Sequence, residues 1–127
     1  MKYFVNISNH PIIGWSEEQR TEAENFVRGE GILIEFPFPQ LDPEATEFDI
    51  LPLAEKTLVD ILNAHPDDEF IFHIMGEMTF VYHFVKFAEN FANRVICVAS
   101  TTKRDVTENE DGSKTSKFKF VRFRQYL

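Results

Sequence analysis

The hydrophobic and polar positions along this chain follow two alternating periods. Short apolar runs typical of buried strands occur at residues 2–7, 31–36, 70–75 and 95–99. Stretches with apolar residues at helical spacing lie between them, at residues 17–27, 50–64 and 79–93. Strands that alternate with helices predict a mainly parallel sheet with helices on both faces. The expected fold class is therefore α/β, a three-layer domain with about four parallel strands.

Capping residues and prolines mark the limits of these elements. Ser16, followed three residues later by Gln19, predicts a helix start with a capping box. Asp49 is expected to cap the next helix, and Pro52 fits the first turn of that helix because its missing N–H costs little there. Three prolines within residues 37–47 predict a loop before this helix.

The C-terminal tail, residues 103–127, follows a different pattern. Two strand-like runs, residues 103–108 and 114–126, flank a polar segment that contains Asp111-Gly112. Asp-Gly between two such runs is a strong signal for a hairpin turn. The tail is therefore expected to form a terminal antiparallel β-hairpin.

The second strand of this hairpin carries a conflict in its own pattern. Strict alternation places Arg122 and Arg124 on the face of Phe118 and Phe120, whereas Phe123 falls on the opposite face. Two explanations are open. Either a β-bulge resets the register, or the arginines continue toward the covered side and need an anionic partner, because an unpaired buried charge is costly.

Length and composition indicate one domain, residues 1–127, with one core. No run of about 18 apolar residues is present, so neither a membrane span nor a membrane partner is expected. The N-terminal apolar run is too short for a signal peptide. The single cysteine, Cys97, lies in an apolar strand pattern and is expected to be a small buried side chain. These features together favour a cytoplasmic location.

The net charge of −8 is divided unevenly along the chain. Residues 103–127 contain seven Lys or Arg and four acidic residues, so the tail is positive, while residues 1–102 contain six and 17 and are strongly acidic. An acidic surface repels long nucleic acid, which excludes it as an expected partner. The basic tail leaves open a small anionic ligand, or a solvated edge strand whose lysines discourage pairing with other strands.

Polar side chains gather where the predicted strands end. The segments that follow the four strands are residues 8–11, 36–39, 76–79 and 100–102. Three of them are rich in small or hydrogen-bonding residues, and the carboxyl ends of parallel strands meet at one edge of a sheet. This convergence predicts a ligand site at that edge, with ordinary turn residues as the alternative.

Several individual residues have two explanations. His10, in a strand-end loop, could hydrogen-bond a phosphate or transfer a proton, or it could be an exposed turn histidine. Glu77, after the flexible Gly76, could act as a ligand or general base, or could complement the helix dipole. His73 and His83 are expected to be structural. The histidines lack metal-ligand spacing, so no metal site and no cofactor is expected.

Three short motifs carry a resemblance to a known family. They are the strand end Asn6-Ile7-Ser8-Asn9-His10-Pro11, the helix start Ser16-Glu17-Glu18-Gln19, and the strand-turn-helix Ile74-Met75-Gly76-Glu77-Met78-Thr79. In these motifs and in the order of its elements, the chain resembles the small CARF-like proteins of type III CRISPR loci. Those proteins are compact Rossmann-like domains that handle cyclic oligoadenylate messengers in antiviral defence.

The resemblance implies a homodimer that binds a cyclic oligoadenylate in a twofold cleft over the strand ends. Some such proteins cleave the ring without a metal, as ring nucleases, using the ribose 2′-hydroxyl as nucleophile. On this model His10 and Glu77 are the catalytic candidates. The expected ligand-binding residues are Ser8, Asn9, Gly76, Thr79, Ser100, Thr101, Thr102, Arg104, Arg122 and Arg124.

The sequence is also compatible with two other functions. The first is a non-catalytic interaction or sequestering module, with the aromatic hairpin as its partner surface. The second is a small enzyme that acts on another phosphorylated or carboxylated metabolite. The overall acidic charge departs from what a nucleotide-binding protein would favour.

Overall fold

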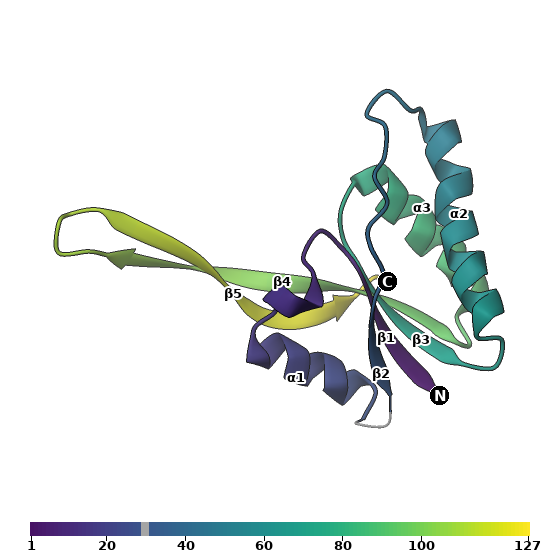
Figure 1. Cartoon of the computed structure of the whole chain (residues 1–127), viewed down its shortest axis with the longest axis horizontal. Coiled ribbons are helices and arrows are strands. Elements are labelled where there is room, and N and C mark those ends of the chain that lie inside the picture. The colour runs from purple at the N-terminus through teal and green to yellow at the C-terminus, as the bar shows by residue number, and fades with distance from the viewer. Residues whose placement is uncertain (29–30) are drawn as a thin grey trace.

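The computed structural model describes residues 1–28 and 31–127, and it shows an α/β fold around one five-stranded sheet (Figure 1). The strands lie in the order β2-β1-β3-β4-β5. Strands β1 to β4 are mutually parallel, and β5 runs antiparallel to β4 at the edge. The strands are β1 (Lys2–Ile7), β2 (Ile32–Glu35), β3 (Glu69–Ile74), β4 (Val95–Glu108) and β5 (Lys114–Gln125). The helices are α1 (Glu17–Phe26), α2 (Glu47–Ala64) and α3 (Met78–Ala88), with short 3-10 turns η1 (Ile12–Gly14) and η2 (Glu89–Phe91).

The helices cover the two faces of the sheet, as Figure 1 shows. Helix α1 packs on one face, where Phe4, Trp15 and Phe123 form the centre of the smaller core cluster. Helices α2 and α3 pack on the other face, over the larger cluster that includes Phe72 and Phe84. We call these faces the α1 side and the α3 side. Alternating side chains of the central strands enter both clusters, which explains why these strands have continuous apolar runs.

Three predicted boundaries are wrong. The helix expected to end at residue 93 ends at Ala88, where the short turn η2 follows it. Thr46, not Asp49, is the N-cap of α2, and the Asp49 carboxylate accepts a hydrogen bond from the Thr46 backbone N–H (3.0 Å) in a capping box. Strand β4 does not end at Ala99 but continues to Glu108, because its pairing with β5 runs through the polar residues 100–102. These residues are therefore part of a strand and do not form a turn.

Two smaller expectations are confirmed. The Ser16 hydroxyl caps α1 by accepting a hydrogen bond from the Gln19 backbone N–H (3.2 Å). Cys97 is buried, and this burial raises the pKa of its thiol to about 12. A thiol with so high a pKa stays protonated at neutral pH and behaves as a small core residue.

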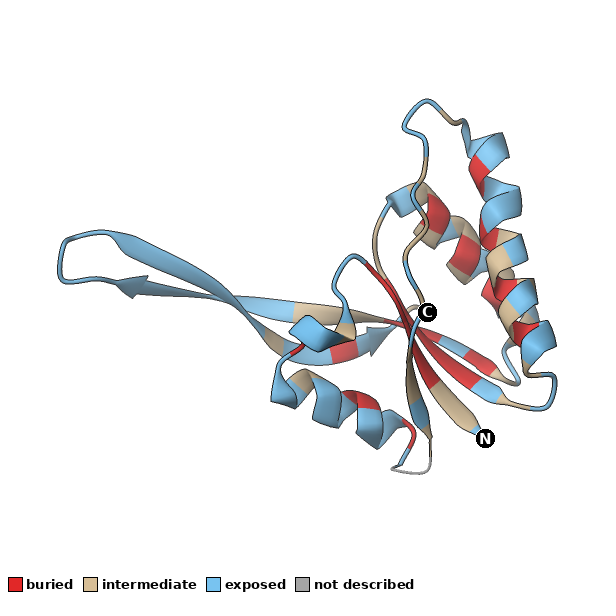
Figure 2. Cartoon of the chain, in the orientation of Figure 1, coloured by how far each residue is buried: buried red, intermediate tan, exposed pale blue. Residues whose placement is uncertain are grey.

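The predicted hairpin is confirmed, and much of it projects beyond the rest of the molecule (Figure 2). A β-bulge lies in β5, since Thr101 pairs with Arg122 and Thr102 pairs with Phe120, leaving Val121 without a partner. The bulge resets the alternation, so that Phe120 and Phe123 both pack on the α1 side. The first explanation of the conflicting pattern is therefore correct, and Arg122 and Arg124 are exposed.

Candidate functional site

A buried polar network joins the carboxyl ends of the central strands on the α1 side. The Asn6 side chain of β1 is fully buried, and its carbonyl oxygen faces the His73 Nδ1 of β3 at 2.7 Å. The same oxygen accepts a hydrogen bond from the Ser8 hydroxyl (2.8 Å). His73 Nε2 lies 3.0 Å from the Ser100 hydroxyl of β4. The Asn6 amide donates to both carboxylate oxygens of Glu35 (3.1 and 3.2 Å).

His73 is neutral in this network, because its pKa lies well below neutral pH. The Asn6 carbonyl oxygen can only accept, so Nδ1 carries the proton and Nε2 accepts from the Ser100 hydroxyl. Burial, with a smaller contribution from the nearby charge of His10, lowers the pKa of His73 to about 4. The Trp15 and His73 rings pack in a T-shaped arrangement, with a centroid distance of 5.3 Å. His73 is therefore structural, as expected from the sequence.

Two of the predicted ligand-binding residues are members of this network. Ser8 is buried and bonded to Asn6, and the Ser100 hydroxyl is bonded to His73. Sequence reasoning missed two members, Asn6 and Glu35. A signal for Asn6 was present, because an amide inside an otherwise apolar strand needs a buried partner. Glu35 gave no such signal, because its role depends on which strands are neighbours.

The loop after β1 brings two candidate residues to the surface. The side chains of Asn9 and His10 are exposed. The backbone carbonyl of His10 accepts hydrogen bonds from the Asn6 amide and from the Trp15 indole, both at 2.9 Å. The loop is thereby held in place while the His10 ring faces solvent. The roles predicted for these two side chains stay predictions.

The turn after β3 has a structural explanation for both of its predicted residues. A Cβ atom on Gly76 would lie 2.5 Å from the Phe38 ring, so only glycine allows this ring to pack against the turn. The Glu77 carboxylate is the N-cap of α3, accepting from the backbone N–H groups of Thr79 (2.9 Å) and Phe80 (2.8 Å). The hydrogen bond from Phe80 is the largest cause that lowers the pKa of Glu77. A carboxylate held in this way is a weak proton acceptor near neutral pH.

The predicted basic residues of the hairpin lie on different faces. The β4–β5 register places Arg122 and Arg124 on the same face as Tyr126, which is the α3 side. Arg104 lies on the opposite face and donates to the Ser116 hydroxyl (3.0 Å). The Thr101 hydroxyl donates to the backbone carbonyl of Arg122 (3.1 Å), and this bond fixes the strand next to the bulge.

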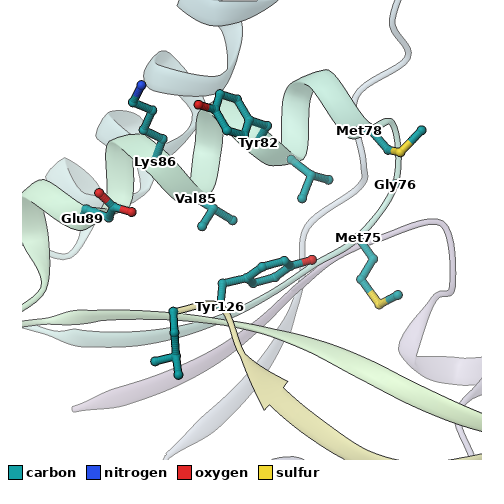
Figure 3. Close-up of a pocket in the computed structure, with 10 residues that line it drawn as sticks. Met75, Gly76, Met78, Tyr82, Val85, Lys86, Glu89 and Tyr126 are labelled. Atoms are coloured by element: carbon teal, nitrogen blue, oxygen red, sulfur yellow. The ribbon is translucent and has the colours of Figure 1, made fainter.

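An open pocket of about 590 Å³ lies on the α3 side, between α3 and the end of β5 (Figure 3). Its walls are mainly apolar and aromatic, with Lys86 and Glu89 toward one end. The lining residues are Met75, Gly76, Met78, Val81, Tyr82, Val85, Lys86, Glu89, Tyr126 and Leu127. The Tyr126 hydroxyl donates to the Ile74 carbonyl (2.9 Å), which ties the pocket floor to the end of β3.

The structure thus divides the predicted site between the two sides of the sheet. Ser8 and Ser100 belong to the network on the α1 side, and His10 is tied to it through its backbone. Gly76, Arg122 and Arg124 belong to the α3 side, and of these Gly76 lines the pocket.

The two remaining threonines lie apart from these groups. Thr79 lies at the start of α3, and Thr102 is exposed on β4. The predicted set therefore does not form one cluster, although parts of it lie on each side.

The sheet order and the helices on both faces define a mixed α/β protein, and the open pocket beside its edge strand is the candidate site. The chain belongs to the Uncharacterized protein MJ1673 family, whose model matches residues 2–124. That match covers almost the whole chain. No curated protein matches the chain.

The described residues contain no group of three or more His, Cys, Asp or Glu side chains placed to hold a metal ion. None of their helices is both long and apolar enough to cross a membrane.

Proposed function

We propose that this protein binds a cyclic oligoadenylate on the α3 side of its sheet. In this proposal an adenine base enters the pocket between α3 and β5, and the phosphates lie against Arg122 and Arg124. The observation that carries the proposal is that an apolar, aromatic-lined pocket and two exposed arginines share one face of β5. A nucleotide combines the two matching parts, a flat apolar base and an anionic phosphate.

The dimensions and the chemistry of the pocket support this choice. A volume of about 590 Å³ is in the usual range for small-molecule sites, which are mostly apolar with a few polar groups. Tyr82 offers an aromatic face on which a base can stack. The guanidinium groups of Arg122 and Arg124 match phosphate oxygens in a bidentate fork.

The fold supports the finer assignment that the domain is Rossmann-like and CARF-like. The chain leaves β1 toward α1 and leaves the neighbouring β3 toward α3 on the opposite face. In parallel α/β sheets such a reversal opens a crevice at the carboxyl ends of the strands, where ligands bind. The proposal includes a homodimer and a cytoplasmic location, and the second is supported by the single, buried cysteine.

The candidate reaction is a metal-independent cleavage of the ring in type III CRISPR defence. The ribose 2′-oxygen attacks the adjacent phosphorus, the bond to the 5′-oxygen breaks, and a 2′,3′-cyclic phosphate forms. In this proposal the ligand extends from the α3 side across the strand ends to the loop after β1. The exposed ring of His10 in that loop is the candidate that accepts the 2′-hydroxyl proton, and the leaving 5′-oxygen takes a proton from water. Glu77 is the weaker of the two catalytic candidates, because both of its oxygens are held by α3.

A melting experiment with a ligand panel tests binding. We expect cyclic tetra-adenylate or hexa-adenylate to raise the melting temperature, since a ligand at about one hundred times its Kd stabilises the folded state by about 2.7 kcal/mol. Linear oligoadenylate and AMP are the matched ligands. No shift with any ring would rule out the proposal, while a shift with AMP alone would favour an enzyme acting on another anionic metabolite. Chromatography of the incubated mixture separates cleavage from sequestration.

Substitutions on the two faces of the hairpin locate the site. Arg122→Ala together with Arg124→Ala should weaken ring binding at least tenfold, because both phosphate contacts are lost. Arg104→Ala is the matched control, since this arginine lies on the opposite face of the same hairpin. Equal effects of the two changes would contradict the placement on the α3 side.

A further inference from the structure

The hairpin contains a segment that nothing in the chain covers. Residues 102–119 are exposed without exception, and this segment, which we call the arm, projects from the sheet (Figures 1 and 2). A two-stranded ribbon is marginally stable by itself in water. Phe118 is 74% exposed and Val106 is 53% exposed, so the arm buries little apolar surface against its own chain. These properties are typical of a segment that docks on another protein surface.

Both faces of the arm carry basic residues, and the excess is larger on one of them. The register places Lys103, Lys117 and Lys119 on the α3 side of the ribbon, together with a single acidic residue, Asp105. The other face carries Val106 and Phe118 with the charged residues Arg104, Glu108 and Lys114. Within the described part of the chain, the ion pairs include none of these three lysines. The arm therefore presents an unpaired basic face.

A surface of complementary character lies at the base of the arm, on the α1 side. A groove of about 460 Å³ runs between α1 and β5. Glu17, Glu18 and Glu22 of α1 form its acidic wall, and Phe120 and Val121 form its apolar wall. In the same described residues, the ion pairs include none of these three glutamates. Lysine side chains suit this groove, because their stems cover apolar surface while their ammonium groups meet the carboxylates.

The arm cannot fill the groove of its own chain. The groove lies on the α1 side of the ribbon, while Lys117 and Lys119 point from the opposite face. Every copy of the chain therefore carries one unfilled acidic groove and one uncovered basic face. A twofold arrangement would fill both grooves and cover the basic faces of both arms, because each contact then occurs twice and the assembly closes.

We propose that the arm is a dimerisation arm, whose basic face docks in the α1 groove of a second copy of this chain. The charge distribution supports a second copy as the partner. The tail from residue 103 onward is positive, whereas residues 1–102 carry 17 acidic residues against six basic ones. The proposal does not depend on the ligand, and it leaves Arg122 and Arg124 outside the contact made by the arm lysines.

Charge-reversal variants test this contact. The quantity measured is the molecular mass of the ligand-free protein in solution. The wild-type chain should sediment at twice its 14.9 kDa, with a Kd that rises at least tenfold between low salt and 1 M salt. Lys117→Glu with Lys119→Glu should weaken the dimer at least tenfold, and so should Glu18→Lys with Glu22→Lys. Combining all four changes in one chain should restore it, because the charges are then exchanged between the two surfaces.

A charge reversal outside the arm and the groove serves as the control. Lys56→Glu with Lys86→Glu changes the net charge by the same amount on α2 and α3, and should leave the dimer unchanged. A monomeric wild-type chain at high concentration, or a dimer that survives the arm reversal, would overturn the proposal. Failure of the fourfold variant to recover while circular dichroism shows a folded chain would also overturn it. A dimer without ring binding would contradict only the proposed ligand.

Discussion

At the carboxyl ends of the strands, polar residues are buried on one side of the sheet and exposed on the other. On the α1 side, Asn6 and His73 are buried and fully engaged with one another and with their neighbours. On the α3 side, which also carries the open pocket, Arg122 and Arg124 stay exposed. The sequence assigned Ser8 and Ser100, which belong to the network on the α1 side, to one candidate site together with the two arginines. The network holds the two serines, whereas the two arginines are free to meet a ligand.

Polar residues at strand ends therefore serve two distinct purposes in this fold. A buried polar group costs about 1–3 kcal/mol when it loses its partner, so a closed network constrains the chain to one arrangement. An exposed charge costs little and remains available for binding. Substitutions on the α1 side should therefore affect mainly the free energy of unfolding, and substitutions on the α3 side should affect mainly ligand affinity.

The largest effect is expected from removing the centre of the network. Asn6→Leu keeps the size of the side chain but leaves the His73 Nδ1–H and the Ser8 hydroxyl without their acceptor. Two such losses should lower the free energy of unfolding by about 4 kcal/mol. Urea unfolding measures the change. Asn9→Leu, at an exposed neighbouring position, is the control and should change it by less than about 0.5 kcal/mol. Equal effects at the two positions would contradict the difference in burial.

A somewhat smaller effect is expected from pH. The pKa of His73 is about 4 in the folded chain and near 6.5 when unfolded, so the unfolded chain binds more protons between these values. This contribution to stability is complete above pH 6.5 and is lost as the pH falls toward 4, by roughly 3 kcal/mol. The check is urea unfolding across this range for wild type and His73→Asn. The variant should have the shallower dependence, and parallel curves would show that His73 is not the group responsible.

The smallest effect on stability is expected from the pocket. Tyr82 is 60% exposed, so Tyr82→Ala should change the free energy of unfolding by less than about 0.5 kcal/mol. The same change should weaken cyclic oligoadenylate binding about tenfold, since base stacking contributes about 1–3 kcal/mol. Calorimetric titration measures the affinity. A large loss of stability with unchanged affinity would assign Tyr82 to the core and reverse the comparison.

Much of the fold was predictable because its signals are local. Apolar runs, the Ser16 cap and the Asp111-Gly112 turn each depend on residues close in the sequence, and each predicted the correct element. The end of β4 was predicted wrongly, since residues 100–102 are polar and only their pairing with β5 makes them a strand. The N-cap of α2 was also misplaced, because Thr46 and Asp49 both have capping side chains.

The candidate site was less predictable, because its members are defined by neighbours that are distant in the chain. Glu35 joins the network only because β2 lies beside β1. The pocket requires the end of β5 to lie against α3, which no local pattern indicates. The face of Arg122 was decided by the bulge at Val121, one residue away in sequence but visible only in the pairing with β4.

Local sequence patterns are enough to predict the alternation of strands and helices, the hairpin, and the separation of an acidic body from a basic tail. These features follow from side-chain period, turn chemistry and charge, which are properties of short segments. Which polar groups are enclosed and which stay free is settled when the chain folds. That choice depends on strand order and register, and a shift of one residue moves each side chain to the opposite face of the sheet.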